Sequence, residues 1–401
     1  MAERNLSSKK KMLAFADGKV LFVSAAFPPS VGGSVVVMRE LLKHYDSNSY
    51  NIVSLRSIGD SGDPEFEKRV FRLGVRKIRP YSIGLWIRFL QVPFILSSAC
   101  RYAKKIEARR IVCIYPTIDF LFLGYLMSKR LGLPLVVYLH DTVAEALVKT
   151  TFAIPARILQ RAVFKRASRI LVMSEGMRQL YLDKYGLETT VIPHIYSEKV
   201  SHRLDNLLPV ARRLFWGGAV YSINNRALNR VISAMQKLQI AFRFTTRNRH
   251  TLLDALSLKE SEALGIETVY YDSRDSYLAA LPVNGVMVLA LNTPEESDYG
   301  ADELATIFPT KTPEYLASGA PILVHCPEHY FLARFFREHN CGLVVSDRDP
   351  EKIAMAIEKL LKSDAEVNDM RRNAMKMRDY FDAESICRRF SCAVQGSEDV
   401  E

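Results

Sequence analysis

The stretch of sequence that decides the fold is FPTKTPEYLASGAP, residues 308–321, which runs directly into the apolar residues ILV at 322–324. Proline is tolerated in the first turn of a helix and glycine just past its end, so the pattern predicts a short helix from Pro313 to Ser318. The apolar run that follows predicts a buried strand. A polar loop, one short helix and a buried strand in this order form a unit that is common in α/β proteins.

Three polar residues, Thr310, Lys311 and Glu314, lie together at the start of this predicted helix. Free backbone N–H groups and the lysine charge favour an anion there. A carboxylate one turn inside the helix can also accept hydrogen bonds from a pair of sugar hydroxyls. A nucleotide diphosphate offers both groups. A structural interpretation is also open, in which Glu314 only complements the helix dipole.

A second loop near the start of the chain has the same character. The apolar run at residues 20–26 is followed by FPPSVGGS at 27–34 and then by a helical pattern that places Val37 and Leu41 on one face. Paired glycines between a strand and a helix let a ligand approach the backbone closely and leave N–H groups pointing outward. Gly32 and Gly33 are therefore predicted to bind an anionic group of a ligand, with Gly33 also stabilising negative charge that develops on that group.

The order and spacing of five segments resemble the family 4 glycosyltransferases of the GT-B fold over nearly the whole chain. They are PPSVGG at 28–33, HD at 140–141, VMSEGM at 172–177, FWGG at 215–218 and PTKTPE at 309–314. The resemblance implies an α/β fold with two Rossmann-like domains facing each other across a donor-binding cleft. It also implies that the anomeric configuration is retained.

One residue departs from this family pattern. The family usually carries a first glutamate, separated from the second by seven residues. Counting back from Glu314 reaches Thr306, and the nearest carboxylate is Glu303. This difference puts the contact with the donor sugar in question.

Strand-like and helix-like segments alternate in both halves, which predicts parallel strands joined by helical crossovers. Residues 197–206 are polar and without periodicity and are predicted to be a linker. We therefore expect an acceptor-side domain at 1–198 and a nucleotide-sugar domain at 207–382. By the resemblance, a C-terminal helix within 383–401 should pack back on the first domain.

The composition restricts the partners and the compartment. The chain has 401 residues, enough for two domains, and a net charge of +11, which favours acidic partners such as a nucleotide diphosphate or an anionic membrane. We find no signature of a nucleic-acid-binding motif. Six cysteines without a CxxC pair are typical of a reducing cytoplasm. No uninterrupted apolar segment is long enough to predict a transmembrane helix.

An aromatic-rich helix is predicted at residues 83–99, flanked by RKIR at 76–79 and by basic residues at 104–110. Basic residues on both sides of such a helix suit the surface of an anionic bilayer. The alternative is a core helix with solvated charged ends. Because Arg88 and Gln91 interrupt the apolar run, the pattern favours the core helix.

Two further residues are predicted to contact the donor. His140 follows the apolar run at 135–139, and ligands bind at the carboxyl ends of such strands, so its imidazole is expected to face the sugar. Its neighbour Asp141 is expected to cap a helix at 143–147. Arg226 lies in the first turn of another predicted helix, where an arginine opposes the dipole, and a diphosphate would offset that cost.

No metal or other cofactor is predicted. The DRD triplet at 347–349 has the DxD spacing of metal-dependent glycosyltransferases, but Asp349 before Pro350 is explained as a helix cap. Histidines and cysteines at 325–341 fit no structural zinc spacing.

These observations predict a retaining, metal-independent glycosyltransferase that uses a nucleotide diphosphate sugar and a glycan or glycolipid acceptor. We expect it in the cytoplasm, either free or peripheral on the inner face of the membrane. Two alternatives stay open: a sugar-nucleotide epimerase of the same fold and a catalytically inactive sugar-nucleotide-binding protein.

Overall fold

The computed structural model describes residues 12–28, 30, 32–55, 66–74, 83–196 and 207–397. Three predicted features lie outside these residues: the linker at 197–206, the basic segment at 76–79, and Pro29 and Val31 of the glycine loop. The chain divides into two units. The first comprises Met1–Tyr138, Val163–Arg169 and Cys387–Glu401, and the second comprises Leu139–Ala162 and Ile170–Ile386.

The first sheet has seven strands in the order β3-β2-β1-β4-β5-β6-β7. Its strands are β1 (Val20–Val23), β2 (Tyr50–Leu55), β3 (Val70–Leu73), β4 (Arg110–Tyr115), β5 (Leu135–Leu139), β6 (Arg169–Val172) and β7 (Thr190–Val191). Val20 of β1 pairs in parallel with Tyr50 of β2 on one side and with Arg110 of β4 on the other. The strand order therefore reverses between β1 and β4, the arrangement of a doubly wound sheet that binds ligands at its carboxyl edge.

The second sheet repeats this topology with six strands in the order β10-β9-β8-β11-β12-β13. Its strands are β8 (Arg213–Trp216), β9 (Ala241–Thr245), β10 (Ile266–Val269), β11 (Val286–Ala290), β12 (Ile322–His325) and β13 (Leu343–Val345). Met287 of β11 pairs in parallel with Phe215 of β8 and with Ile322 of β12. The central strand β11 is apolar and buried throughout because helices cover both faces of a parallel sheet, whereas β9 and the edge strand β10 contain the charged residues Arg243 and Glu267.

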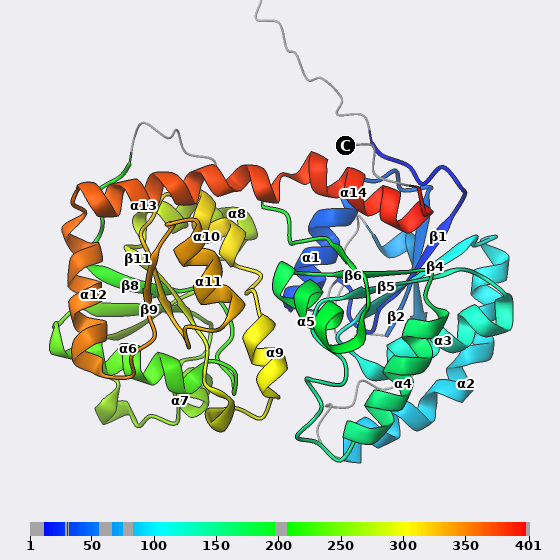
Figure 1. Ribbon diagram of the computed structural model, residues 1–401, viewed down its shortest axis with the longest axis horizontal. Coiled ribbons are helices and arrows are strands. Elements are labelled where there is room, and N and C mark those ends of the chain that lie inside the picture. The colour runs from blue at the N-terminus through cyan, green and yellow to red at the C-terminus, as the bar shows by residue number, and fades with distance from the viewer. Residues whose placement is uncertain are drawn as a thin grey trace, which may run out of the picture. The chain divides into compact units, whose positions relative to one another are not determined.

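Helices connect the strands of both sheets (Figure 1). The α-helices are α1 (Gly33–Leu42), α2 (Ile83–Lys105), α3 (Ile118–Leu131), α4 (Ala153–Arg166), α5 (Glu175–Tyr185), α6 (Asn225–Lys237), α7 (Arg249–Leu256), α8 (Arg274–Ala280), α9 (Ala301–Thr306), α10 (Thr312–Ala317), α11 (Phe331–Glu338), α12 (Pro350–Lys362), α13 (Ala365–Lys376) and α14 (Ala383–Gln395). Short 3₁₀ helices are η1 (Glu67–Arg69), η3 (Glu260–Glu262), η4 (Leu281–Val283), η5 (Pro294–Glu296) and η6 (Met377–Phe381).

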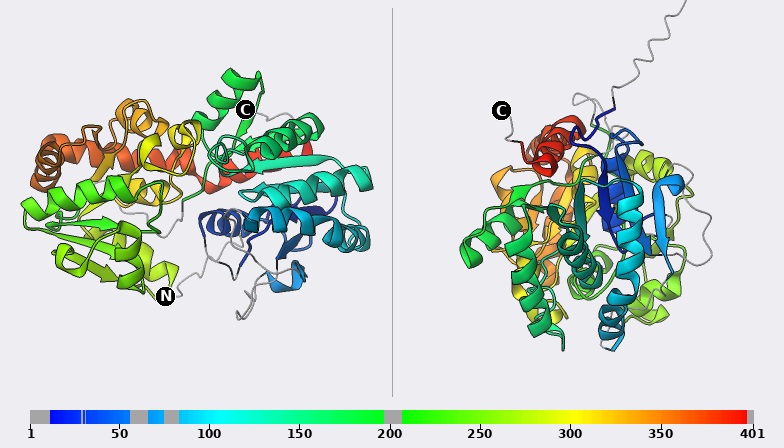
Figure 2. Two further views of the ribbon diagram at one scale, coloured as in Figure 1. Left: turned by 90° about the horizontal axis from the view of Figure 1, so that it is seen from below. Right: turned by 90° about the vertical axis from the view of Figure 1, so that its right-hand side faces the viewer.

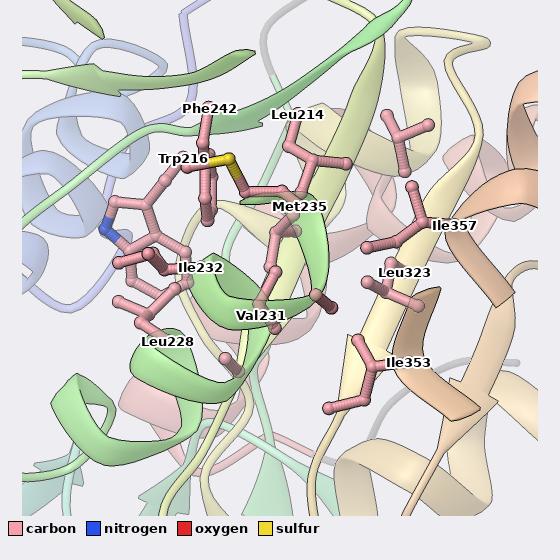
Figure 3. Close-up of a cluster of buried hydrophobic side chains, with 14 of the residues drawn as sticks. Leu214, Trp216, Leu228, Val231, Ile232, Met235, Phe242, Leu323, Ile353 and Ile357 are labelled. Carbon is pink, nitrogen blue, oxygen red and sulfur yellow. The ribbon is translucent and has the colours of Figure 1, made fainter. Parts of the chain in front are cut away.

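The core of the second unit lies between α6, the sheet and α12 (Figure 3). From α6, Val231 and Met235 point toward the strands, and Ile357 of α12 meets Leu323 of β12. Trp216, at the end of β8, is almost fully buried in this cluster. The cluster thereby fixes the end of β8, where the loop with the Gly217-Gly218 pair begins.

The C-terminal helix α14 contributes to the first unit from Cys387 onward. The ring of Phe390 stacks on Phe22 of β1 with a centroid distance of 6.3 Å and contacts Phe15 and Tyr45 edge-on. The hydroxyl of Tyr45 donates a hydrogen bond to the backbone carbonyl of Cys387. Helix α14 therefore packs on strand β1, which lies near the start of the chain.

The long helix α2 is the cyan ribbon beside α3 in Figure 1, and Figure 2 shows it from two further sides. It extends to Lys105, further than the predicted end at residue 99. Its Arg88 is buried and forms a bidentate ion pair with Asp119 of α3, with nitrogen–oxygen distances of 2.7–3.0 Å. A charge that interrupts the apolar sequence is thus neutralised on the packed face of the helix.

Candidate functional site

Lys311 lies at the N-cap position of α10 and turns its ammonium group onto the face of Trp216. The Nζ atom is 2.9 Å from the centre of the indole ring, a cation–π contact. Burial lowers the pKa of Lys311 well below its usual value. Among the residues that the structure describes, no carboxylate forms an ion pair with this lysine. An anion bound beside it would therefore compensate a charge that the folded chain leaves without a counter-ion.

The Gly217-Gly218 pair makes room for this lysine. Gly218 has a φ of 139°, which side chains rarely adopt, and a Cβ there would lie 3.7 Å from Lys311 Nζ. A Cβ on Gly217 would clash with the hydroxyl of Tyr277. The Gly217 N–H donates a hydrogen bond of 2.7 Å to the hydroxyl of Tyr315. The turn after β8 is therefore held close to the start of α10.

Glu314, in the first turn of α10, is buried and ion-paired. Its carboxylate accepts a hydrogen bond from the guanidinium of Arg274, the first residue of α8. The Nε2 atom of His194 lies 3.9 Å from the Oε1 atom of Glu314. Neither Arg274 nor His194 was identified from the sequence. The position of His194, three residues past β7 at the carboxyl end of a strand, is the signal that would have found it.

His140 follows β5, as predicted, and both of its ring nitrogens are buried. Although the residue keeps some exposed surface, desolvation of the ring lowers the pKa of His140 to about 3, and the nearby His194 lowers it further. Because the imidazole is neutral above that pH, it can exchange hydrogen bonds but carries no positive charge at neutral pH.

The predicted helix cap at Asp141 is wrong, because residues 141–152 form turns rather than a helix. The backbone N–H of Thr142 donates a 2.8 Å hydrogen bond to Oε2 of Glu303, and the Thr142 hydroxyl donates to the same oxygen. Glu303, a carboxylate distant in sequence, thus accepts the hydrogen bonds of the Thr142 backbone N–H and hydroxyl, which a helix turn at this position would have used. Burial raises the pKa of Glu303, and the nearby Asp141 raises it further.

Thr306 stands where the family pattern has its first glutamate, and its side-chain hydrogen bonds are local. Its hydroxyl donates to the backbone carbonyls of Asp302 and Glu303 at 3.1 Å and 3.0 Å. Its own carbonyl accepts a 3.1 Å hydrogen bond from the Ser174 hydroxyl. The carboxylate closest to it in sequence, Glu303, is engaged by Thr142 instead.

The remaining predicted donor-binding residues are spread over both units. Gly32 caps α1 in the first unit with a φ of 154°, and both it and Gly33 are exposed. Thr310 is half-buried on the turn that leads into α10. Arg226 is exposed in the first turn of α6. The structure thus places Lys311 and Glu314 together and leaves Arg226 on the surface.

The DxD triplet has the structural role predicted for it. Asp349 Oδ1 accepts a 3.0 Å hydrogen bond from the Glu351 N–H at the start of α12, with Pro350 in the first turn. Asp347 forms an ion pair with Lys352. His325 is also structural, because one ring nitrogen contacts the Val345 carbonyl at 2.8 Å. No cluster of three or more metal-binding side chains occurs within the described ranges.

One family model and several solved structures match the chain. Residues 31–197 match the model of Glycosyltransferase Family 4. Sucrose-phosphate synthase from Thermosynechococcus elongatus is similar in structure, with 16% identity, a TM-score of 0.66, and coverage of 93% of this chain and 97% of the other. HepE from Anabaena in complex with UDP has 14% identity, a TM-score of 0.67, and coverage of 94% and 100%. WaaG, a glycosyltransferase involved in lipopolysaccharide biosynthesis, has 13% identity, a TM-score of 0.66, and the same coverage.

No curated protein sequence matches the chain at a significant level. The structural neighbours are distant in sequence, so they establish the fold. The predicted GT-B fold of two Rossmann-like sheets is confirmed.

Proposed function

Because the chain carries a glycosyltransferase family 4 domain on a GT-B fold, we propose that it transfers a sugar from a nucleotide diphosphate donor to a hydroxyl of a glycan or glycolipid, with retention of configuration. The observation that carries the proposal is the buried side chain of Lys311, whose pKa is lowered by desolvation and which has no carboxylate counter-ion among the described residues. A diphosphate supplies that counter-ion. UDP, which occupies the structurally similar HepE, is the first donor nucleotide to test.

The residues have distinct roles in this reaction. The bond between the anomeric carbon and the phosphate oxygen breaks, the acceptor oxygen bonds to that carbon on the same face, and the acceptor proton goes to the released phosphate. Lys311 stabilises the charge that develops on the leaving diphosphate. The neutral imidazole of His140 hydrogen-bonds a sugar hydroxyl, and Glu314 holds the ribose.

Glu314→Gln is expected to weaken nucleotide diphosphate binding by about 1–3 kcal/mol, the scale of a lost hydrogen bond to a charged group. Isothermal titration calorimetry with UDP measures the loss. Stability should change little, because the Arg274 side chain, 24% exposed, can be hydrated when its partner is neutralised. Glu296→Gln is the matched control, since Glu296 also pairs with an arginine, Arg230 at 2.6 Å. Equal affinities for the Glu314 variant and wild type would remove Glu314 from the site.

Transfer is proposed to need no divalent metal. Activity should therefore persist in excess chelator, measured as sugar transferred per unit time. The Asp347→Ala/Asp349→Ala double variant should lose about 0.5–2 kcal/mol of stability with the α12 cap, while its transfer rate stays near that of wild type. Inactivation by chelator that manganese or magnesium reverses would overturn this part of the proposal.

The exposed side of α2 supports a further part of the proposal, namely that the acceptor is presented at a membrane surface. The side of α2 opposite its packed face carries an apolar stripe, defined by Trp86, Ile87, Leu90 and Phe94, in which Leu90 is 65% and Phe94 84% exposed. Arg101, Lys104 and Lys105 continue the exposed side of the same helix toward its C-terminal end. None of the described helices is long and apolar enough to cross a membrane. The proposed partner of the stripe is the surface of an anionic bilayer that presents a glycolipid acceptor.

Two other functions are distinguished by donor turnover. An epimerase of this fold would consume the sugar nucleotide without an acceptor. An inactive descendant, suggested by Thr306 in place of a glutamate, would bind the nucleotide and never turn it over. Turnover that depends on an added acceptor supports the transferase.

A further inference from the structure

His194 is a buried histidine whose hydrogen-bonding capacity the folded chain does not use. The residue is only 3% exposed, and neither ring nitrogen has a hydrogen-bond partner among the described residues. Buried polar atoms in native proteins are nearly always paired, so each exception needs an explanation. The chain itself provides the contrast: buried His325 contacts the Val345 carbonyl with one nitrogen and receives a hydrogen bond from Arg230 on the other.

His194 lies among polar side chains at the end of a strand. It follows β7 and the nearby His140 follows β5, so both lie at the carboxyl edge of a parallel sheet, the edge at which such sheets bind ligands. On the other side stands the carboxylate of Glu314, itself held by Arg274. The unused imidazole thus faces the residue that the proposed function assigns to the ribose.

The distance between the two side chains fits one bridging hydroxyl. Nε2 of His194 and Oε1 of Glu314 are 3.9 Å apart, too far for a direct hydrogen bond. One oxygen placed about 2.8 Å from each atom closes that gap with an angle of about 90°. A hydroxyl group can donate to the carboxylate and at the same time accept from an imidazole N–H.

We propose that His194 is a donor-binding residue, which shares one ribose hydroxyl of the nucleotide with Glu314 and so selects ribonucleotides over deoxyribonucleotides. The inference rests on the proposed function, because it takes the nucleotide diphosphate as the ligand. It adds a residue from the segment after β7 to a site otherwise built by α8 and α10. The site formed by His194 and Glu314 recognises the vicinal hydroxyl pair of the ribose rather than a phosphate.

The test compares UDP with 2′-deoxy-UDP and 3′-deoxy-UDP by calorimetry. Wild type should bind UDP about tenfold more tightly than one of the two deoxy analogues. His194→Ala should lose about tenfold in UDP affinity and keep only the part of the selectivity that the hydrogen bond to Glu314 provides. His194→Gln, which retains an N–H donor, should recover part of the selectivity.

His325→Ala is the matched control, a buried histidine with both nitrogens engaged. It should lower the melting temperature and leave the ribose selectivity intact, whereas His194→Ala should not lower the melting temperature below that of wild type. Selectivity equal to that of wild type in a folded His194→Ala protein overturns the assignment of His194 while the proposed function stands. A wild type that binds no nucleoside diphosphate, whatever its base, overturns both.

Discussion

Replacing Lys311 with methionine will lower the rate of sugar transfer by about 10²- to 10³-fold. Removing one preorganised group that stabilises a developing negative charge typically costs that much, because such groups act in a site with little water. Methionine keeps the length and apolar volume of the side chain against Trp216 but has no charge. The loss is measured as kcat with saturating donor and acceptor, so that weaker donor binding does not obscure it.

The same variant should be more stable than wild type. Between its lowered folded pKa and its unfolded pKa near 10.4, Lys311 is neutral in the folded chain and protonated in the unfolded chain. The unfolded state then binds more protons, so the contribution of Lys311 to stability rises with pH across this window and is unfavourable below it. Removing the lysine removes that cost, and the melting temperature at neutral pH should rise.

Lys237→Met is the control, since Lys237 lies on α6 and pairs with Glu351 on the surface. It should change neither rate nor melting temperature appreciably. Full activity in the Lys311 variant would contradict its role on the diphosphate. A parallel fall in rate and melting temperature would show instead that the lysine supports the fold.

The strands were predictable because each is a short apolar run between polar turns. The predicted run at 135–139 coincides with β5, and the run at 322–324 coincides with the first three residues of β12. The edge strand β3 was missed, because three of its four residues are only half-buried and its sequence, VFRL, lacks a continuous apolar run. The extent of a strand is thus readable where both faces are covered and obscure at the edge of a sheet.

The candidate site was predicted in its local part only. Lys311 and Glu314 are three positions apart at the start of one helix, α10, and a single sequence motif contains both. Arg274 and His194 reach Glu314 from segments 40 and 120 residues away, so no local pattern relates them to it. The failed cap at Asp141 has the same cause, since Glu303 satisfies Thr142 from a distance of 161 residues in sequence.

Helix α2 shows a third limit of sequence reasoning. The core and surface interpretations each describe one side of it. Arg88 and Val92 are buried on one side, while Leu90 and Phe94 are exposed on the other. The sequence of this helix does not distinguish a buried apolar residue from an exposed one. The side that packs against the neighbouring helix α3 is buried, and the residues on the opposite side are exposed to water.

Replacing Leu90 and Phe94 with serine will reduce partitioning onto anionic vesicles by about 100-fold. Each side chain gains about 1.5–3 kcal/mol when it is fully buried, and both are now largely exposed. Reversing Arg101, Lys104 and Lys105 to glutamate should weaken binding by a comparable factor, at about 1 kcal/mol for each basic residue near the surface. Vesicle co-sedimentation over a range of salt concentrations measures both effects.

The two sets of variants separate the sources of binding. Charge reversal should act only on anionic vesicles and lose its effect as salt shortens the screening length, whereas the serine variant should also reduce the weaker binding to neutral vesicles. Leu264→Ser is the control, because Leu264 is 78% exposed but lies in the second unit, outside the stripe. Its partitioning should equal that of wild type. Salt-insensitive binding that neither set of variants alters, or no binding at all, would contradict the membrane partner and leave an acceptor in solution as the substrate.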